Sequence, residues 1–194
     1  TLPPEISASL DLEVFKYGLA AMWDDRNSDL YPTSGSLITF DAFQGEVTGR
    51  FGRDYNKAIL QGSYFQPLSA GKSVLALSGT LCHASKTAPF FDSCSIGLTD
   101  NLRGFSVTEY IGETLISAQA EYRGRINNGR FGYVAFLGAG SVLGTKTSDA
   151  GIHTAAGLGI RYRLSKALPV DFSVDATRNS NNETLYYIYV GQSF

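Results

Sequence analysis

Residues 116–126 read ISAQAEYRGRI, and their apolar side chains occupy every second position. One set of alternating positions holds Ile116, Ala118, Ala120, Tyr122, Gly124 and Ile126. The other set holds Ser117, Gln119, Glu121, Arg123 and Arg125. A period of two places these sets on opposite faces of a β-strand, whereas a helical period of 3.6 mixes them. The stretch is therefore predicted to be a strand with one apolar face and one polar, charged face.

The same alternation recurs along the chain. In residues 156–164 the polar face is cationic, and in residues 170–177 Asp171 and Asp175 face away from the apolar side chains. Weaker alternating segments lie at residues 10–24, 36–43, 57–65, 72–82, 131–143 and 184–194. Clusters of Asn, Asp, Ser, Gly and Pro separate many of these segments, as turns do. The sequence predicts an all-β, antiparallel chain of about eight to ten strands, in one domain over residues 1–194.

Composition agrees with this class. Charged residues make up 18% of the 194 residues, against about 25% in an ordinary soluble domain, and Gly is abundant at 21 residues. The formal charge of −2 provides no field that would attract nucleic acid. No apolar run reaches the roughly 18 residues that a spanning helix needs. The chain begins with Thr1 and no leader pattern follows, so a mature or trimmed sequence is expected.

Alternation fits both a half-buried soluble sheet and a membrane barrel, because both have one apolar face. The predicted polar faces carry both signs of charge on neighbouring strands, which suits a hydrated or plugged lumen crossed by ion pairs. These lumen residues are Glu121, Arg123, Arg125, Arg161, Arg163, Asp171 and Asp175. The last strand is predicted to place four residues on one face: Tyr186, Ile188, Val190 and Phe194. This ending resembles the C-terminal signal that the barrel-insertion machinery reads in outer-membrane barrels.

Six stretches, in order, resemble the polypeptide-transport outer-membrane barrels of the BamA/TamA type, also called the bacterial surface antigen superfamily. They are WDDRN (23–27) with YPTSGS (31–36), NLRGF (101–105), AEYR (120–123), FLGAG (136–140), GLGIRY (157–162) and VGQSF (190–194). NLRGF resembles the family's Val-Arg-Gly-Phe loop motif, and it lies in a long irregular segment at about residues 84–113. The resemblance covers nearly the whole chain.

The resemblance implies that the long loop folds back into the barrel. Its motif residues would be Leu102, Arg103, Gly104 and Phe105, with Arg103 as the loop anchor. Acidic residues of the wall hold this Arg in the family, so Glu121 is the expected partner, among lumen residues that include Arg123, Arg161 and Asp171. A guanidinium suits such a site because its rigid fork binds carboxylates in a bidentate manner. The family's strand aspartate is Gly138 here, a departure that affects how the loop docks.

Length is a second departure. The family's barrel has sixteen strands preceded by periplasmic domains, and this chain matches only the C-terminal barrel part. The chain could be a small closed barrel of ten strands, a fragment of a longer protein, or an open sheet completed by a second copy. An open edge cannot face lipid, because each unpaired backbone group there costs several kcal/mol. An open sheet is therefore expected to form a homo-oligomer.

Cys82 and Cys94 are the two cysteines of the chain, and both lie near the start of the long segment. Their spacing suits a disulfide in an oxidising compartment. A metal site would need more ligands than the neighbouring His83 provides. His83 and His153 are both interpreted as loop residues, and no nucleophile, acid-pair or phosphate-loop motif accompanies them. No enzyme activity and no cofactor are expected.

The sequence therefore predicts a protein of the bacterial outer membrane that contacts the lipid bilayer and lipopolysaccharide. It would depend on the barrel-insertion machinery during biogenesis and act in protein insertion or translocation, without periplasmic domains. Two alternatives stay open. One is a passive pore or scaffold with the same fold, and the other is a soluble ligand-binding β-barrel.

Overall fold

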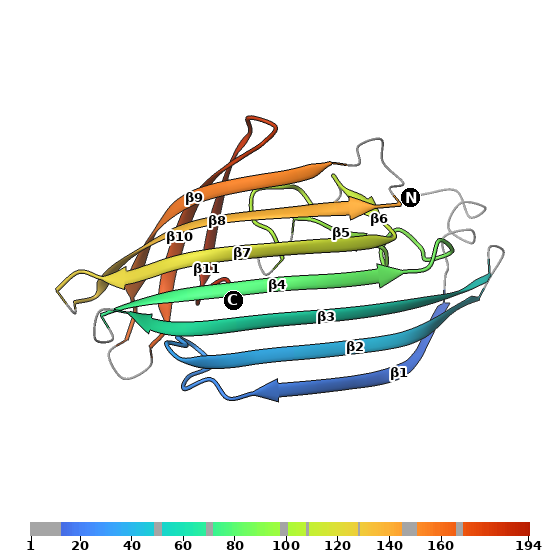
Figure 1. The fold of residues 1–194 in the computed structure, drawn as a ribbon, viewed down its shortest axis with the longest axis horizontal. Coiled ribbons are helices and arrows are strands. Elements are labelled where there is room, and N and C mark those ends of the chain that lie inside the picture. The colour runs from blue at the N-terminus through green and yellow to red at the C-terminus, as the bar shows by residue number, and fades with distance from the viewer. Residues whose placement is uncertain are drawn as a thin grey trace, which may run out of the picture.

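Nine long strands form one antiparallel sheet in the computed structural model of the chain (Figure 1). The structure describes residues 13–48, 52–68, 72–97, 101–107, 109–127, 129–144, 151–165 and 169–194. The long strands are β1 (Glu13–Asp24), β2 (Gly35–Thr48), β3 (Arg53–Leu68), β4 (Ser73–Ala84), β7 (Thr114–Arg125), β8 (Phe131–Leu143), β9 (Ile152–Arg163), β10 (Asp171–Asn179) and β11 (Thr184–Val190). Each matches a predicted segment; residues 10–12 of the first one lie outside the described residues.

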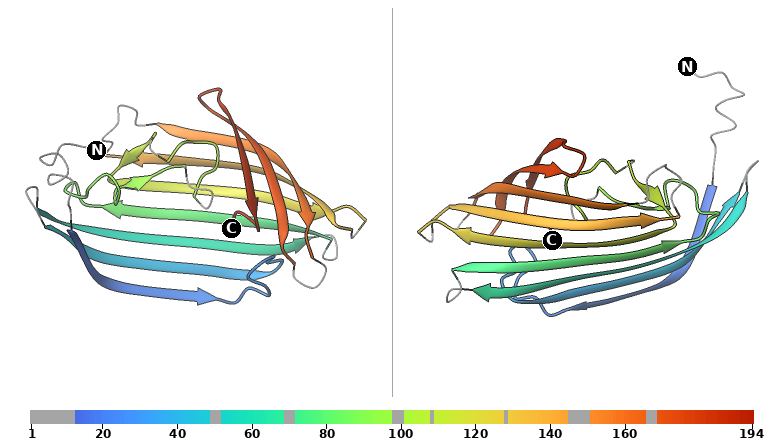
Figure 2. Two further views of the ribbon diagram at one scale, coloured as in Figure 1. Left: turned by 180° about the vertical axis from the view of Figure 1, so that it is seen from behind. Right: turned by 45° about the horizontal axis from the view of Figure 1, so that its top comes forward.

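Each long strand pairs with its neighbours in the chain, so the sheet runs in order from β1 to β11. β1 and β11 do not pair with each other within the described residues, and the sheet is therefore an open trough (Figure 2). The fold is all-β and antiparallel, as predicted, in its barrel-half form. The described residues contain no helix that is long and apolar enough to cross a membrane.

The long connection between β4 and β7 lies against the concave face of the trough (Figure 2). It contains the short strands β5 (Cys94–Ser95) and β6 (Ile111–Gly112), which pair with each other. The sequence did not reveal this pair, because two residues are too few to show a period. The predicted loop at about residues 84–113 is thus present and folded inward.

The convex face of the sheet is the apolar one. Leu137 and Ile160 point outward and are 63% and 62% exposed, whereas Glu121 and Arg161 point inward and are at most 2% exposed. A soluble barrel has the opposite arrangement, with its bulky apolar side chains inside. Exposed apolar surface on every long strand is the pattern that lipid contact requires.

The two ends of the trough differ. We call the end that carries the connections after β2, β4, β8 and β10 the loop end, because the long connection starts there. The opposite end carries the connections after β1, β3, β7 and β9, and we call it the turn end.

Cys82 in β4 and Cys94 in β5 form the predicted disulfide, which ties the long connection to the wall. The interpretation of both histidines as loop residues is wrong. His83 lies in β4 with its side chain outward, and His153 lies in β9 with its side chain buried inside. Each sits at the end of a strand that extends further than its apolar alternation showed.

Phe194 does not share a face with Tyr186, Ile188 and Val190, so this part of the prediction is wrong. Those three side chains point outward from β11, which ends at Val190. Gly191 then adopts a φ of 109°, a left-handed conformation that glycine tolerates. The chain turns inward there, and Phe194 packs against an inner cluster formed by Phe65, Val74 and Ala76.

Candidate functional site

The long connection presses its LRGF motif against the concave face. Leu102, Arg103 and Phe105 are each at most 1% exposed, although they belong to a loop. Gly104 between them is also buried. The structure thus places all four predicted loop residues in the interior of the trough.

Arg103 joins two strands that are far apart in the sheet. Its Nη2 donates to Oε2 of Glu121 in β7 over 2.7 Å, and its Nη1 donates to Oδ2 of Asp175 in β10 over 3.0 Å. Its backbone N–H donates to Oε1 of Gln119 over 3.2 Å. The guanidinium carbon lies 3.6 Å from the centroid of the Phe136 ring. Two carboxylates and an aromatic face therefore surround a guanidinium that has no access to water.

Gly104 makes the backbone contacts of the motif. Its N–H donates to the hydroxyl of Tyr187 over 2.7 Å, and its carbonyl accepts a hydrogen bond from Nδ2 of Asn179 over 2.8 Å. Its φ is 112°, and a Cβ at this position would lie 2.8 Å from the Cβ of Ala155. Glycine is therefore required for both the conformation and the close approach to the wall.

Leu102 packs against Gly138, the position at which the family pattern has an aspartate. A Cβ on Gly138 would lie 2.7 Å from Cδ1 of Leu102 and 2.8 Å from Cγ of Gln119. The wall thus has a notch at Gly138, and Leu102 fills it. Asp175 in β10 supplies the second carboxylate to Arg103. Arg103 thus pairs with the expected wall partner, Glu121, and with Asp175 as a second one.

Phe105 completes the docking through an aromatic cluster at the loop end. Its ring centroid lies 5.7 Å from those of Tyr110 and His153, and the Tyr110 and His153 rings lie 3.7 Å apart. Because these rings come from the loop and from β9, they fix the loop against the wall beyond the ion pairs.

The remaining predicted lumen residues form ion pairs toward the turn end. Arg161 pairs with Asp175, and Nε of Arg123 lies 3.2 Å from Oε1 of Glu121. Asp171 does not meet Arg103; it pairs with Arg125 and Arg163 instead. The seven predicted lumen residues therefore belong to two separate ion-pair groups.

Comparison with known proteins identifies this arrangement. Residues 7–194 match the Omp85 superfamily domain. The chain belongs to the Omp85 superfamily. Among solved structures, the fold is similar to that of BamA from Haemophilus ducreyi lacking POTRA domains 1–3, with a TM-score of 0.66 and 16% sequence identity. That match covers 91% of this chain and 42% of the BamA chain, so this chain spans less than half of its length. No curated protein sequence matches this chain.

The Omp85 membership settles the alternatives on location. The chain is a barrel domain of the bacterial outer membrane, and its convex face contacts membrane lipid. The soluble ligand-binding barrel is set aside. Omp85 members are transport and assembly proteins and not enzymes.

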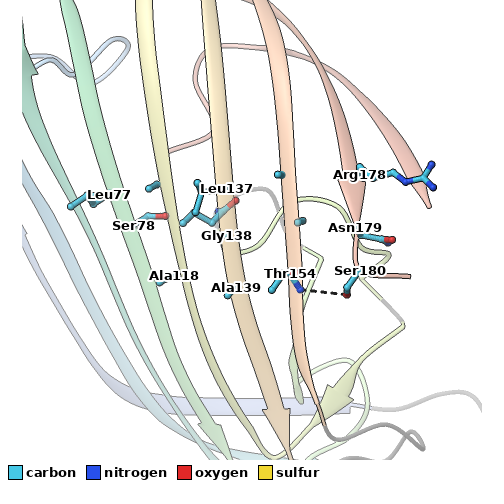
Figure 3. A pocket seen from close by; sticks show the side chains of 14 residues that line it. Leu77, Ser78, Ala118, Leu137, Gly138, Ala139, Thr154, Arg178, Asn179 and Ser180 are labelled. Atoms are coloured by element: carbon cyan, nitrogen blue, oxygen red, sulfur yellow. Dashed lines mark hydrogen bonds between the residues drawn. The ribbon is translucent and has the colours of Figure 1, made fainter. Parts of the chain in front are cut away.

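The lipid-facing surface of this Omp85 sheet is hollowed by a groove that crosses β4, β7, β8, β9 and β10 (Figure 3). Leu77 and Leu137 are among its bulky side chains. Small side chains also line it: Ala118, Ala120, Ala139, Thr154 and Ala156. A membrane lipid can fill such a groove, so it belongs to the general lipid contact of the barrel.

The start of the Omp85 loop is bound, through Asp92, to the side of the trough formed by β1 and β3. Nζ of Lys16 in β1 lies 2.7 Å from Oδ2 of Asp92, and the hydroxyl of Tyr55 in β3 donates to the same carboxylate. Burial raises the pKa of Asp92. The hydrogen bonds from Lys16 and Tyr55 lower it by a larger amount, so the net shift is downward. This contact could not be predicted from the sequence, because its partners are widely separated in the chain.

Proposed function

We propose that this Omp85 chain acts in the insertion or translocation of polypeptides at the outer membrane, with the loop at about residues 84–113 as its working element. The observation that supports this role best is the burial of Arg103 between Glu121 and Asp175. A loop that only connected two strands would have no reason to place a charged side chain inside the wall. Arg103 is therefore proposed as the anchor of the loop, and Leu102, Gly104 and Phe105 as its supports.

The loop spans the trough. At its start Asp92 forms an ion pair with Lys16 of edge strand β1. Further along, the Gly104 N–H donates a hydrogen bond to the hydroxyl of Tyr187 in edge strand β11. A loop that contacts both edges can respond when a polypeptide enters or when an edge strand moves. This geometry supports a role in handling polypeptides more than a role as a passive scaffold.

The partners of the chain follow from its two surfaces. We propose that the apolar convex face contacts phospholipid and lipopolysaccharide, and that Tyr186, Ile188 and Val190 on β11 are read by the insertion machinery during biogenesis. The open edges at β1 and β11 require strands to cover them in lipid. A second copy or further strands of a longer chain would serve, and residues 1–194 would then act as one domain of that assembly.

The test is reconstitution of the chain into liposomes, with an unfolded outer-membrane barrel as client. Client folding is followed by the heat-dependent shift of its gel mobility. Arg103→Ala is expected to lose the acceleration of client folding that the unaltered chain provides. Arg178→Ala is the matched control, because Arg178 is exposed on the outer side of β10.

Two results would contradict the proposal. If neither the unaltered chain nor Arg103→Ala accelerates client folding, while both conduct ions across the bilayer, the passive pore is the correct function. If Arg103→Ala folds and works as well as Arg178→Ala, the loop anchor has no part in the activity.

A further inference from the structure

The interior contains two ion-pair groups in which arginines outnumber carboxylates. Its first ion-pair group consists of Arg103, Arg123, Arg161, Glu121 and Asp175. The second group consists of Arg125, Arg163 and Asp171. Each group has one arginine more than it has carboxylates, so the two together carry an excess of two positive charges. Buried charge without a counter-charge is costly, which makes this excess unusual.

The excess is also visible as hydrogen-bond donors without acceptors. In the described part of the chain, Nη1 of Arg123, Nε of Arg125 and Nη2 of Arg163 are buried and have no hydrogen-bond partner. The Arg123 side chain is only 1% exposed. Arg125 and Arg163 are joined through Asp171, so their guanidinium groups lie close together. Buried donors of this kind normally find an acceptor.

The two groups meet around Tyr31, which lies in the connection between β1 and β2 at the turn end. Its ring centroid is 4.8 Å from the guanidinium carbon of Arg163, 4.9 Å from that of Arg125 and 5.9 Å from that of Arg123. An aromatic face attracts cations but has no lone pair for their N–H groups. Tyr31 therefore marks where the three guanidinium groups converge, and it leaves their free donors unsatisfied.

We propose that the turn end of the interior binds a phosphate group between Arg123, Arg125 and Arg163. Phosphate supplies several acceptor oxygens in a tetrahedral arrangement, and guanidinium groups bind such oxygens in pairs. Its negative charge offsets the excess of the two ion-pair groups. The Tyr31 ring lies beside the three guanidinium groups at the rim of this site.

The phosphate can come from free inorganic phosphate or from a phospholipid headgroup. The turn end lies at one limit of the apolar convex band, the level at which headgroups are found. Both sources present the same phosphate chemistry to the three arginines. The site does not depend on the proposed polypeptide activity.

The test uses the full chain, folded in detergent micelles. Urea unfolding is measured in inorganic phosphate and in chloride at equal ionic strength. At a free phosphate concentration ten times the dissociation constant, the unfolding equilibrium constant is expected to fall about 11-fold relative to chloride. Arg163→Gln is expected to abolish this difference. Arg178→Gln, which changes an exposed arginine on the outer face, should retain it.

Arg163→Lys keeps the fold testable if Arg163→Gln does not refold. Lysine retains the charge but lacks the guanidinium fork. The phosphate affinity should therefore fall, and the difference in stability between phosphate and chloride should shrink. Dihexanoylphosphatidylglycerol is titrated in parallel: competition with inorganic phosphate indicates that a lipid headgroup reaches the site, and lack of competition restricts the site to the free ion. A phosphate effect equal to that of chloride, or one unchanged in both Arg163 variants, overturns the proposal.

Discussion

Arg103 and Asp175 are 72 residues apart in the chain, yet Nη1 of Arg103 donates a hydrogen bond to Oδ2 of Asp175 over 3.0 Å. The same carboxylate group also pairs with Arg161 and accepts a hydrogen bond from the hydroxyl of Tyr189 over 2.8 Å. Asp175 is fully buried, so none of these contacts is weakened by water. One side chain of β10 thus connects the loop to β9 and β11.

Asp175→Asn is expected to destabilise the folded chain strongly. The change leaves Arg103 and Arg161 buried with too little negative charge, and breaking a buried pair in this way costs about 3–5 kcal/mol. The measurement is the free energy of unfolding in urea, in detergent micelles. Asp41→Asn is the control, because Asp41 is exposed on β2. Equal stabilities of the two variants would show that the ion pairs with Asp175 contribute little.

Gly138→Ala is expected to weaken the docking of the loop, because the new methyl group meets Leu102 and Gln119 at under 3 Å. Overpacking of this kind costs about 1–3 kcal/mol. Protease accessibility of the loop reports the loss of docking. Gly62→Ala is the matched control, since a Cβ at Gly62 would have no neighbour within 4 Å.

A second variant isolates the cause of the Gly138 effect. Adding Leu102→Ala to Gly138→Ala empties the space that the methyl group needs, so part of the lost protection should return. If the double variant loses more protection from protease than the losses of the two single variants added together, the notch is not the reason for glycine at this position.

Much of the fold could be predicted because strand alternation is a local signal. The charged face of β7 identified Glu121 and Arg123 as lumen residues, and the LRGF motif identified Arg103. The contact of Arg103 with Asp175 could not be predicted, because the inward position of Asp175 was visible but β10 lies three strand pairings from β7, which carries Glu121. Phe194 was misplaced because alternation does not show where Gly191 turns the chain inward.

Loss of the disulfide is expected to loosen the start of the loop. Cys82 and Cys94 close a loop with a sequence separation of 12, for which the chain-entropy estimate is about 3 kcal/mol. The variant that combines Cys82→Ser with Cys94→Ser should therefore unfold at lower urea than the unaltered chain. Treatment with a thiol reductant should lower the stability of the unaltered chain and leave the double variant unchanged. A reductant effect on the double variant would mean that the loss arises elsewhere.

Acid is expected to release the start of the loop from β1, because Asp92 must be ionised to pair with Lys16. The folded-state pKa of Asp92 lies below its ordinary value of 3.8, since the hydrogen bonds from Lys16 and Tyr55 outweigh the effect of burial. A lowered pKa means that the carboxylate stabilises the fold fully above its unfolded pKa of about 3.9. That contribution is lost as the pH falls through the folded value.

The measurement is the free energy of unfolding of the unaltered chain and of Asp92→Asn between pH 7 and about pH 2, a range that spans the ordinary carboxyl pKa. The difference between them should be constant above about pH 5 and shrink below pH 4, because only the unaltered chain has the Asp92 carboxylate to protonate. Other carboxylates titrate in both chains and cancel in the comparison. A difference that does not change with pH would show that Asp92 contributes through its hydrogen bonds alone and not through its charge.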